Sequence, residues 1–223
     1  MGYTCDELGR GEETSLRVMT GGGDGFTAGQ VEGAKGGDAD AFELIFNRFR
    51  SRLSFWIAVK MGPVLRQRLA VDDVVQETFL QAFSSLDSYE DRGSGSFFRW
   101  LIAVAGNRLR DLHKYHGAAK RHPAKEVALG LSPDEPGPTD VVATSSSPSS
   151  QAGKKELVTR LLGGMDRLPE SLREVISLRA LEERTYKEIA DSLGKSAATA
   201  QVLYCRALQE LRRQLGNETD RRS

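Results

Sequence analysis

The sequence predicts an all-α protein of two small helical domains joined by a flexible linker. Apolar residues recur at three- and four-residue steps in two blocks, 31–116 and 154–216, and no segment shows the strict alternation of a β-strand. The stretch between them, 117–153, is rich in Ser, Pro and Gly and has few large apolar residues to offset the entropy of ordering. The ends, 1–30 and 217–223, are expected to be tails.

The first block predicts three amphipathic helices. Asp38 or Asp40 can cap the first helix, and Gly62-Pro63 breaks its pattern. The three apolar stripes are Phe42, Ile45, Phe46, Phe49, Leu53 and Trp56; then Val71, Val74, Val75, Phe79, Ala82, Phe83 and Leu86; then Phe98, Leu101, Ile102, Ala105, Leu109 and Leu112.

The second block carries the local signals of a helix-turn-helix. Thr185 and Glu188 form a capping box that begins a short helix, Gly194 ends this helix, and Ser196 can cap a longer one. Two earlier helices, 154–166 and 169–181, would support this pair and complete a four-helix domain. The local pattern is also that of any helical hairpin.

Overall composition excludes several classes of protein. The 223 residues contain 31 Lys and Arg and 31 Asp and Glu, so the chain is not uniformly basic, although its charges can still be sorted by face. The acidic start and the short longest apolar run, Trp100–Ala105, predict no signal peptide and no membrane insertion, and hence a cytoplasmic protein. Cys5 and Cys205 lack the CxxC spacing of a thiolate zinc site.

Four polar side chains lie on the back of the second helix of the first block: Asp72, Asp73, Gln76 and Glu77. Three carboxylates so close together can serve acid–base chemistry or bind a metal, but no histidine or further carboxylate stands at a suitable spacing. A solvated helix face, or a docking surface for a basic partner, fits the pattern better.

The third helix carries cations and an amide opposite its apolar stripe, namely Arg99, Asn107, Arg110 and Lys114. Together with the aromatic residues Tyr89 and Trp100, these are the parts of a surface for unpaired nucleic acid, because cations neutralise phosphates and aromatic rings stack on bases. An ordinary solvated face has the same charges. His113 and His116 supply at most half of a metal site.

Three motifs, in this order, resemble bacterial sigma factors. Residues 72–79 resemble the DDxxQExF core of that family, and residues 96–101 with Asn107 and Asp111 resemble its F-x-x-W-L…N-x-x-x-D helix. Leu168-Pro169 with Arg173, followed by residues 186–194, resembles the C-terminal helix-turn-helix domain. Two such domains and a tether are the layout of the extracytoplasmic-function group of the sigma-70 family.

The resemblance implies a promoter-specificity subunit without catalytic residues, cofactor or metal. Its implied partners are bacterial core RNA polymerase, promoter DNA and, in addition, an anti-sigma factor. The implied polymerase-binding residues are Asp72, Asp73, Gln76 and Glu77. The implied contacts to the melted −10 strand are Tyr89, Arg99, Trp100, Asn107, Arg110 and Lys114, and those to the −35 duplex are Ser196, Ala198, Thr199, Gln201, Val202 and Arg206.

The sequence departs from the family at the recognition helix. A basic residue followed by Ser-Arg is usual there, whereas this chain has Gln201, Val202 and Leu203. Fewer cations predict a weaker grip on −35 DNA, and Val202 can contact a thymine methyl or a protein. Two other hypotheses remain at this stage: a helix-turn-helix regulator that never joins polymerase, and a helical metal-dependent hydrolase.

Overall fold

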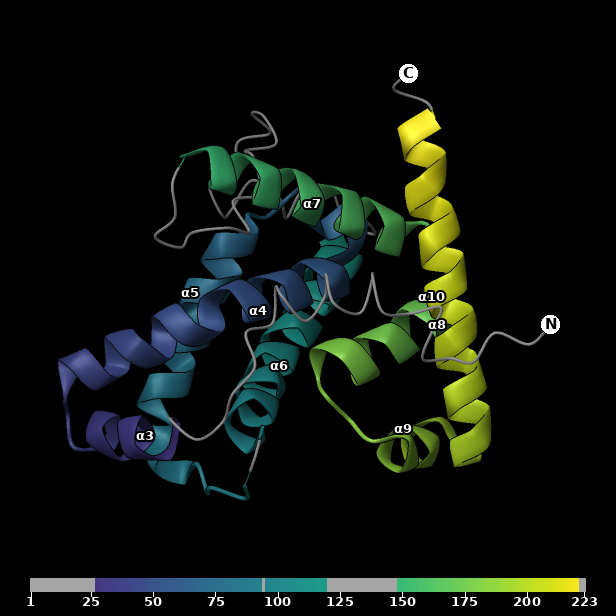
Figure 1. Cartoon of the computed structure of the whole chain (residues 1–223). Helices are drawn as coiled ribbons and strands as arrows, with labels where there is room; N and C mark the ends of the chain where they lie inside the picture. Colours follow the sequence, from purple (N-terminus) through teal and green to yellow (C-terminus); the bar gives the residue numbers. More distant parts are fainter. Residues whose placement is uncertain (1–26, 94, 120–147, 221–223) are drawn as a thin grey trace. The chain divides into compact units, whose positions relative to one another are not determined.

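The computed structural model describes residues 27–93, 95–119 and 148–220, and within these ranges every regular element is helical (Figure 1). The chain divides into two compact units, whose described residues are 27–119 and 148–220. The all-α prediction is therefore confirmed. No helix among the described residues is long and apolar enough to cross a membrane.

The described residues of the N-terminal unit form four α-helices and one 3₁₀ turn. They are α3 (Thr27–Lys35), α4 (Ala39–Arg66), α5 (Val71–Ser84), η1 (Leu86–Ser88) and α6 (Ser96–Ala119). Asp38 caps α4, because its Oδ1 accepts hydrogen bonds from the backbone N of Asp40 (2.9 Å) and of Ala41 (3.3 Å). Gly62 interrupts α4 with φ 67° and ψ 170°, directly before Pro63, as the sequence predicts.

Aromatic rings form the centre of the N-terminal core. Phe49 of α4 lies 5.2 Å from Phe97 and 5.8 Å from Phe98 of α6, between ring centroids, and Phe46 lies 4.7 Å from Phe79 of α5. The predicted stripes are buried, except that Phe42, Phe46 and Phe83 are half-buried. The core therefore joins α4, α5 and α6 through the faces that the apolar spacing predicts, and their polar faces remain outside.

The C-terminal unit also follows the predicted order. It contains α7 (Pro148–Asp166), α8 (Glu170–Ile176), the π-helix η3 (Ser177–Leu181), α9 (Tyr186–Leu193) and α10 (Ala197–Asp220). Ala200, Tyr204, Ala207, Leu208 and Leu211 form the buried face of α10. Gly164 lets α7 approach α10 closely, since a Cβ there would lie 2.9 Å from Leu211 Cδ1.

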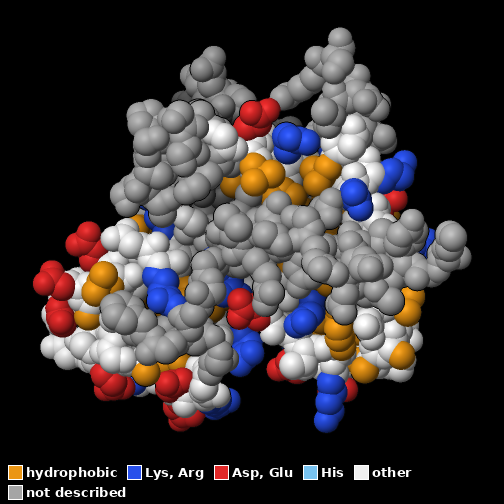
Figure 2. Space-filling model, in the orientation of Figure 1, with side chains coloured by type: hydrophobic (Ala, Val, Ile, Leu, Met, Phe, Trp, Pro, Cys, Tyr) orange, Lys and Arg blue, Asp and Glu red, His pale blue; other side chains and the backbone are white. Residues whose placement is uncertain are grey.

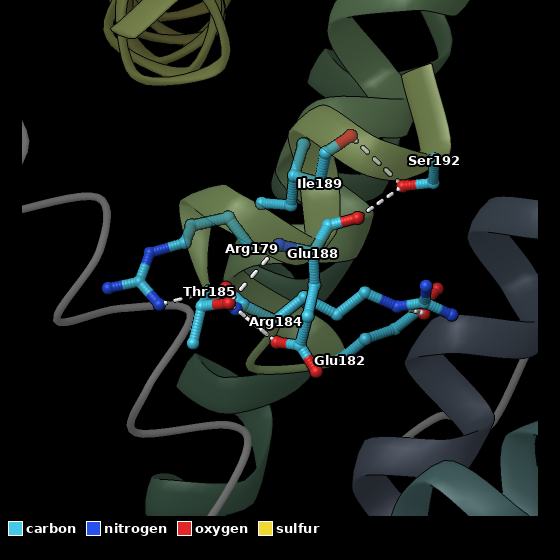
Figure 3. A network of polar contacts seen from close by, with 7 residues as sticks. All are labelled: Arg179, Glu182, Arg184, Thr185, Glu188, Ile189 and Ser192. Atoms are coloured by element: carbon cyan, nitrogen blue, oxygen red, sulfur yellow. Dashed lines mark hydrogen bonds and ion pairs between the residues drawn. The ribbon is translucent and has the colours of Figure 1, made fainter. Parts of the chain in front are cut away.

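A polar network holds the turn into α9 (Figure 3). Thr185 Oγ1 accepts from the backbone N of Glu188 (3.2 Å), while Glu188 Oε2 accepts from the backbone N of Thr185 (2.7 Å), which confirms the capping box. Arg179 Nη1 donates to the Arg184 carbonyl (3.0 Å), and Arg184 Nε donates to the buried carboxylate of Glu182 (3.0 Å). The first helix of the helix-turn-helix, α9, thus begins at a turn that several hydrogen bonds stabilise.

The helices run beyond the predicted domain boundaries. Helix α3 begins at Thr27, inside the predicted tail 1–30. Helix α6 ends at Ala119 and α7 begins at Pro148, and both of these residues lie inside the predicted linker 117–153. Helix α10 continues to Asp220, past the predicted start of the last tail at 217. A helix already begun gains one backbone hydrogen bond for each residue added, so it can continue past its last apolar contact. The remaining tail and linker residues lie outside the described ones.

Candidate functional site

The polar face of α5 is exposed. Asp73, Gln76 and Glu77 are exposed, whereas Val74 and Val75 on the opposite face are buried. The same helix therefore packs on one side and leaves the predicted polymerase-binding side free of core contacts.

Two of the α5 carboxylates are held from neighbouring helices. Asp72 is half-buried, and its Oδ1 accepts from Arg50 Nη2 of α4 at 3.3 Å. Glu77 Oε2 accepts from Arg108 Nε of α6 at 2.6 Å, and both side chains remain partly exposed, at 49% and 37%. These arginines fix where the carboxylates lie. Sequence analysis missed both, since each stands on a different helix from its partner.

An apolar side chain extends the same face of α5. Leu80 follows Asp73, Gln76 and Glu77 at helical spacings of seven, four and three residues, and it is 70% exposed. Sequence analysis did not single it out, although its place outside the apolar stripe could have done so. The exposed stripe of α5 is defined here as Asp73, Gln76, Glu77 and Leu80.

Helix α6 presents most of the predicted −10 residues at its surface. Asn107, Arg110 and Lys114 are exposed, and Arg99 and Trp100 are half-buried. Arg110 Nη2 donates to Asn107 Oδ1, one turn away, so the cation and the amide form one polar pair on this face.

Tyr89, a predicted −10 contact, is buried in this structure, where the residue is only 6% exposed. The ring centroid lies 5.2 Å from Phe97 and 5.4 Å from Trp100, and the hydroxyl lies 2.6 Å from Ser96 Oγ. Burial raises the pKa of Tyr89. Packed against Phe97 and Trp100, the ring closes the loop before α6, and its contact with the −10 strand stays a prediction.

Asp91 organises the same loop. Its Oδ1 accepts from the backbone N of Gly93 (2.9 Å) and from Ser96 Oγ (2.9 Å), and these hydrogen bonds lower the pKa of Asp91. These hydrogen bonds hold the loop where it enters α6. Arg99 and Trp100 therefore lie close to the start of this helix.

The outward face of α10 exposes every predicted −35 residue: Ser196, Ala198, Thr199, Gln201, Val202 and Arg206. Ser196 caps the helix, because its Oγ accepts from the backbone N of Thr199 at 3.1 Å and lies 2.8 Å from Thr199 Oγ1. Small Ala198 and aliphatic Val202, which is 65% exposed, occupy the middle of this face.

Further along α10, Arg213 forms an ion pair within the same helix. Arg213 donates to both carboxylate oxygens of Glu210, at 2.9 and 2.6 Å, and Gln214 donates to the same carboxylate at 2.7 Å. These hydrogen bonds, with that of Arg213 the strongest, lower the pKa of Glu210 to about 2. The recognition helix is therefore even less cationic outward than its sequence indicates.

The described residues hold no group of three or more His, Cys, Asp or Glu side chains able to bind a metal ion. His113 is exposed and His116 half-buried on α6. On the face drawn in Figure 2, acidic side chains gather over α3 and the first part of α4.

Comparison with known proteins covers both units. Residues 46–118 match the family model "Sigma-70 region 2", and residues 159–211 match "Sigma-70, region 4". The ECF RNA polymerase sigma-E factor of Escherichia coli is 30% identical over 184 residues, which are 81% of this chain and 90% of that protein. The ECF RNA polymerase sigma factor SigD of Mycobacterium tuberculosis is 28% identical over 182 residues, 82% of this chain and 80% of that protein.

A solved structure, that of CnrH in complex with the cytosolic domain of CnrY, is also similar. It is 24% identical, with a TM-score of 0.45, over 87% of this chain and 97% of that chain. The family matches stand in the order that the motifs predict, and each falls on one of the two compact units. The chain therefore belongs to the extracytoplasmic-function sigma factors of the sigma-70 family.

Proposed function

We propose that this sigma factor joins core RNA polymerase through the exposed stripe of α5 and positions promoter DNA on α6 and α10. The observation that carries the proposal is the division of α5 into a packed apolar face and an exposed stripe with two carboxylates. As a partner of RNA polymerase the protein would act in the cytoplasm. It would serve as an initiation factor without catalysis of its own.

The polymerase contact would combine charge with one apolar residue at the end of the stripe. Asp73 and Glu77 offer negative charge to a basic partner, and Leu80 offers apolar area that binding would remove from water. The Arg108 guanidinium holds the Glu77 carboxylate in place, so less side-chain freedom is lost on binding.

The −10 contact would use the exposed face of α6. Arg110 and Lys114 would follow the phosphates of the melted strand, while Asn107 would hydrogen-bond a base edge. Arg99 and the half-buried Trp100 would contribute at the first turn of the helix. In the packing seen here, Tyr89 would act by supporting Trp100.

The −35 contact would use the first turns of α10 in the major groove. Ser196, Ala198, Thr199, Gln201 and Val202 lie at the exposed start of the helix, where helix-turn-helix proteins contact base edges. Arg206 would supply a phosphate contact one turn further along. With Arg213 paired to Glu210, we expect weak −35 binding that relies on polymerase and on the −10 contacts.

The family match over residues 46–118 favours a sigma factor over a helix-turn-helix regulator that does not join polymerase. A regulator of that kind needs only the C-terminal unit, so this hypothesis leaves the exposed stripe of α5 unexplained. An anti-sigma factor is a further partner that membership of this family suggests.

Run-off transcription tests the proposal. Purified core polymerase, with and without the full chain, is given a library of promoter fragments, and transcript lengths are measured. We expect the chain to produce discrete start sites that core polymerase alone does not. Transcription no different from that of core polymerase on every template would contradict the proposed function.

A further inference from the structure

We propose that Val202 determines −35 specificity by packing against the 5-methyl group of a thymine in the major groove. This inference rests on the proposed function, since it assumes that α10 enters duplex DNA. It adds the class of base pair that the recognition helix selects and the residue that selects it.

Val202 is placed in the middle of the outward face of α10. Ala198, Val202 and Arg206 recur every four residues and form one exposed stripe, while Ala200, Tyr204 and Ala207 are buried on the other side of the helix. A helix that lies in the groove with this stripe forward brings Val202 closest to the base edges.

The exposure of Val202 is unusual within its unit. At 65%, it is the only large aliphatic side chain exposed among residues 155–216, whose side chains are all described. The core accounts for the other large aliphatic residues of α10, since Leu208 and Leu211 are buried and Leu203 is half-buried. Packing within the unit therefore gives no reason for a valine at this position.

The neighbours of Val202 leave room for a base-edge contact. Ala198, one turn earlier, is small and lets the backbone come near the groove floor, and the Thr199 hydroxyl is engaged with Ser196 at the helix cap. Arg206, one turn later, carries the charge that holds the stripe to a phosphate. The contact at Val202 itself is thus purely apolar.

Among the four bases only thymine matches such a contact in the major groove. Its 5-methyl group projects there beside the O4 acceptor, whereas guanine, adenine and cytosine present hydrogen-bonding groups and no methyl group at their major-groove edges. Valine offers no hydrogen bond, so placing it against those polar edges would leave them desolvated and unpaired. Val202 would therefore select thymine both by contact and by exclusion.

The test removes the methyl groups that would touch, from each partner in turn. Full chain with core polymerase first selects its preferred −35 sequence from a library randomised there, and run-off transcription confirms initiation on the selected promoter. Each thymine of the selected element is then replaced by deoxyuridine, which lacks only the 5-methyl group. Binding of wild type and Val202→Ala to each duplex is compared.

We expect one thymine whose replacement by deoxyuridine weakens wild-type binding roughly fourfold, the effect of losing one buried methyl-sized contact. Val202→Ala should bind the unmodified promoter more weakly and lose its sensitivity to deoxyuridine at that position. Val202→Thr, which keeps one methyl group, should be intermediate. Alanine favours helix, so the variant should fold.

Matched controls separate this contact from general effects. Val64→Ala truncates a similarly exposed valine (58%) in the other unit and should change neither affinity nor deoxyuridine sensitivity. Deoxyuridine outside the −35 element should also be without effect.

Three results would overturn the inference: no sensitive thymine, a sensitivity that persists in Val202→Ala, or a selected element without thymine. If initiation on the selected promoter remains, only the role of Val202 fails. If initiation is absent altogether, the proposed function fails with it. A Val202→Ala variant that instead loses affinity for core polymerase without DNA would place this side chain against a protein and would also overturn the inference.

Discussion

Reversing the charge of Asp73 should separate polymerase binding from folding. Asp73 is exposed on α5, and within the described part of the chain its carboxylate makes no hydrogen bond or ion pair. Asp73→Lys should therefore leave stability nearly unchanged, since surface substitutions away from specific contacts usually change it by less than about 0.5 kcal/mol. Asp72 is a poorer choice because Arg50 holds it.

The expected loss of affinity follows from the exposure of this carboxylate. Two unit charges about 4 Å apart attract by roughly 1 kcal/mol in a water-like environment, and by more where an interface excludes water. Reversing one charge turns that attraction into repulsion, so the difference is at least about 2 kcal/mol. The dissociation constant for core polymerase should rise by roughly 30-fold or more.

Titration of fluorescently labelled core polymerase, without DNA, measures this constant. Asp87→Lys is the matched control, because Asp87 is an exposed carboxylate of the same unit and the change in net charge is the same. Equal affinities of the two variants would refute the assignment of the exposed stripe of α5 to polymerase. A general effect of charge would produce that result.

Three further predictions concern the C-terminal unit. Thr185→Ala removes the α9 cap and should lower the free energy of unfolding by about 1 kcal/mol in urea titration; an unchanged midpoint would contradict the cap's role. Gly164→Val should cost about 1–3 kcal/mol, since even a Cβ would lie 2.9 Å from Leu211 Cδ1, and normal stability would mean that α7 moves freely. Because the pKa of Glu210 is lowered from 4.5 to about 2, its stabilising contacts should persist above pH 4.5 and be lost as the pH falls toward 2; Arg213→Ala should return the pKa toward 4.5 in an NMR titration.

Local signals made most of the fold predictable. Asp38, Gly62-Pro63 and Thr185 act on residues within a few positions of themselves, so their sequence context is enough to place a cap or a break. The buried faces of α5, α6 and α10 follow from spacing alone, because a helix brings every third or fourth residue to one side. Helix ends were less predictable, since a helix can extend without further packing.

Contacts between distant residues could not be predicted in this way. Tyr89 follows a polar stretch, where an aromatic ring is expected to be exposed. In the structure it instead packs against three residues of α6: Ser96, Phe97 and Trp100. Arg108 and Glu77 are 31 positions apart, so only the packing of α5 against α6 brings them together. Spacing along one helix carries no information about such a pair.

Ion pairs within each unit limit the number of cations that this chain, which has no net charge, can offer to DNA. Arg108 and Arg213 each form an ion pair with a carboxylate of the same unit, so they attract phosphates less than unpaired cations would. Few phosphate contacts mean a small non-specific affinity and a shallow dependence on salt. Discrimination at −35 must then come from base edges, and affinity from the attachment of α10 to a unit already bound to polymerase, which raises its effective concentration near the promoter. An apolar residue such as Val202 is suited to a recognition helix that supplies discrimination rather than affinity, because it contributes selectivity without adding charge.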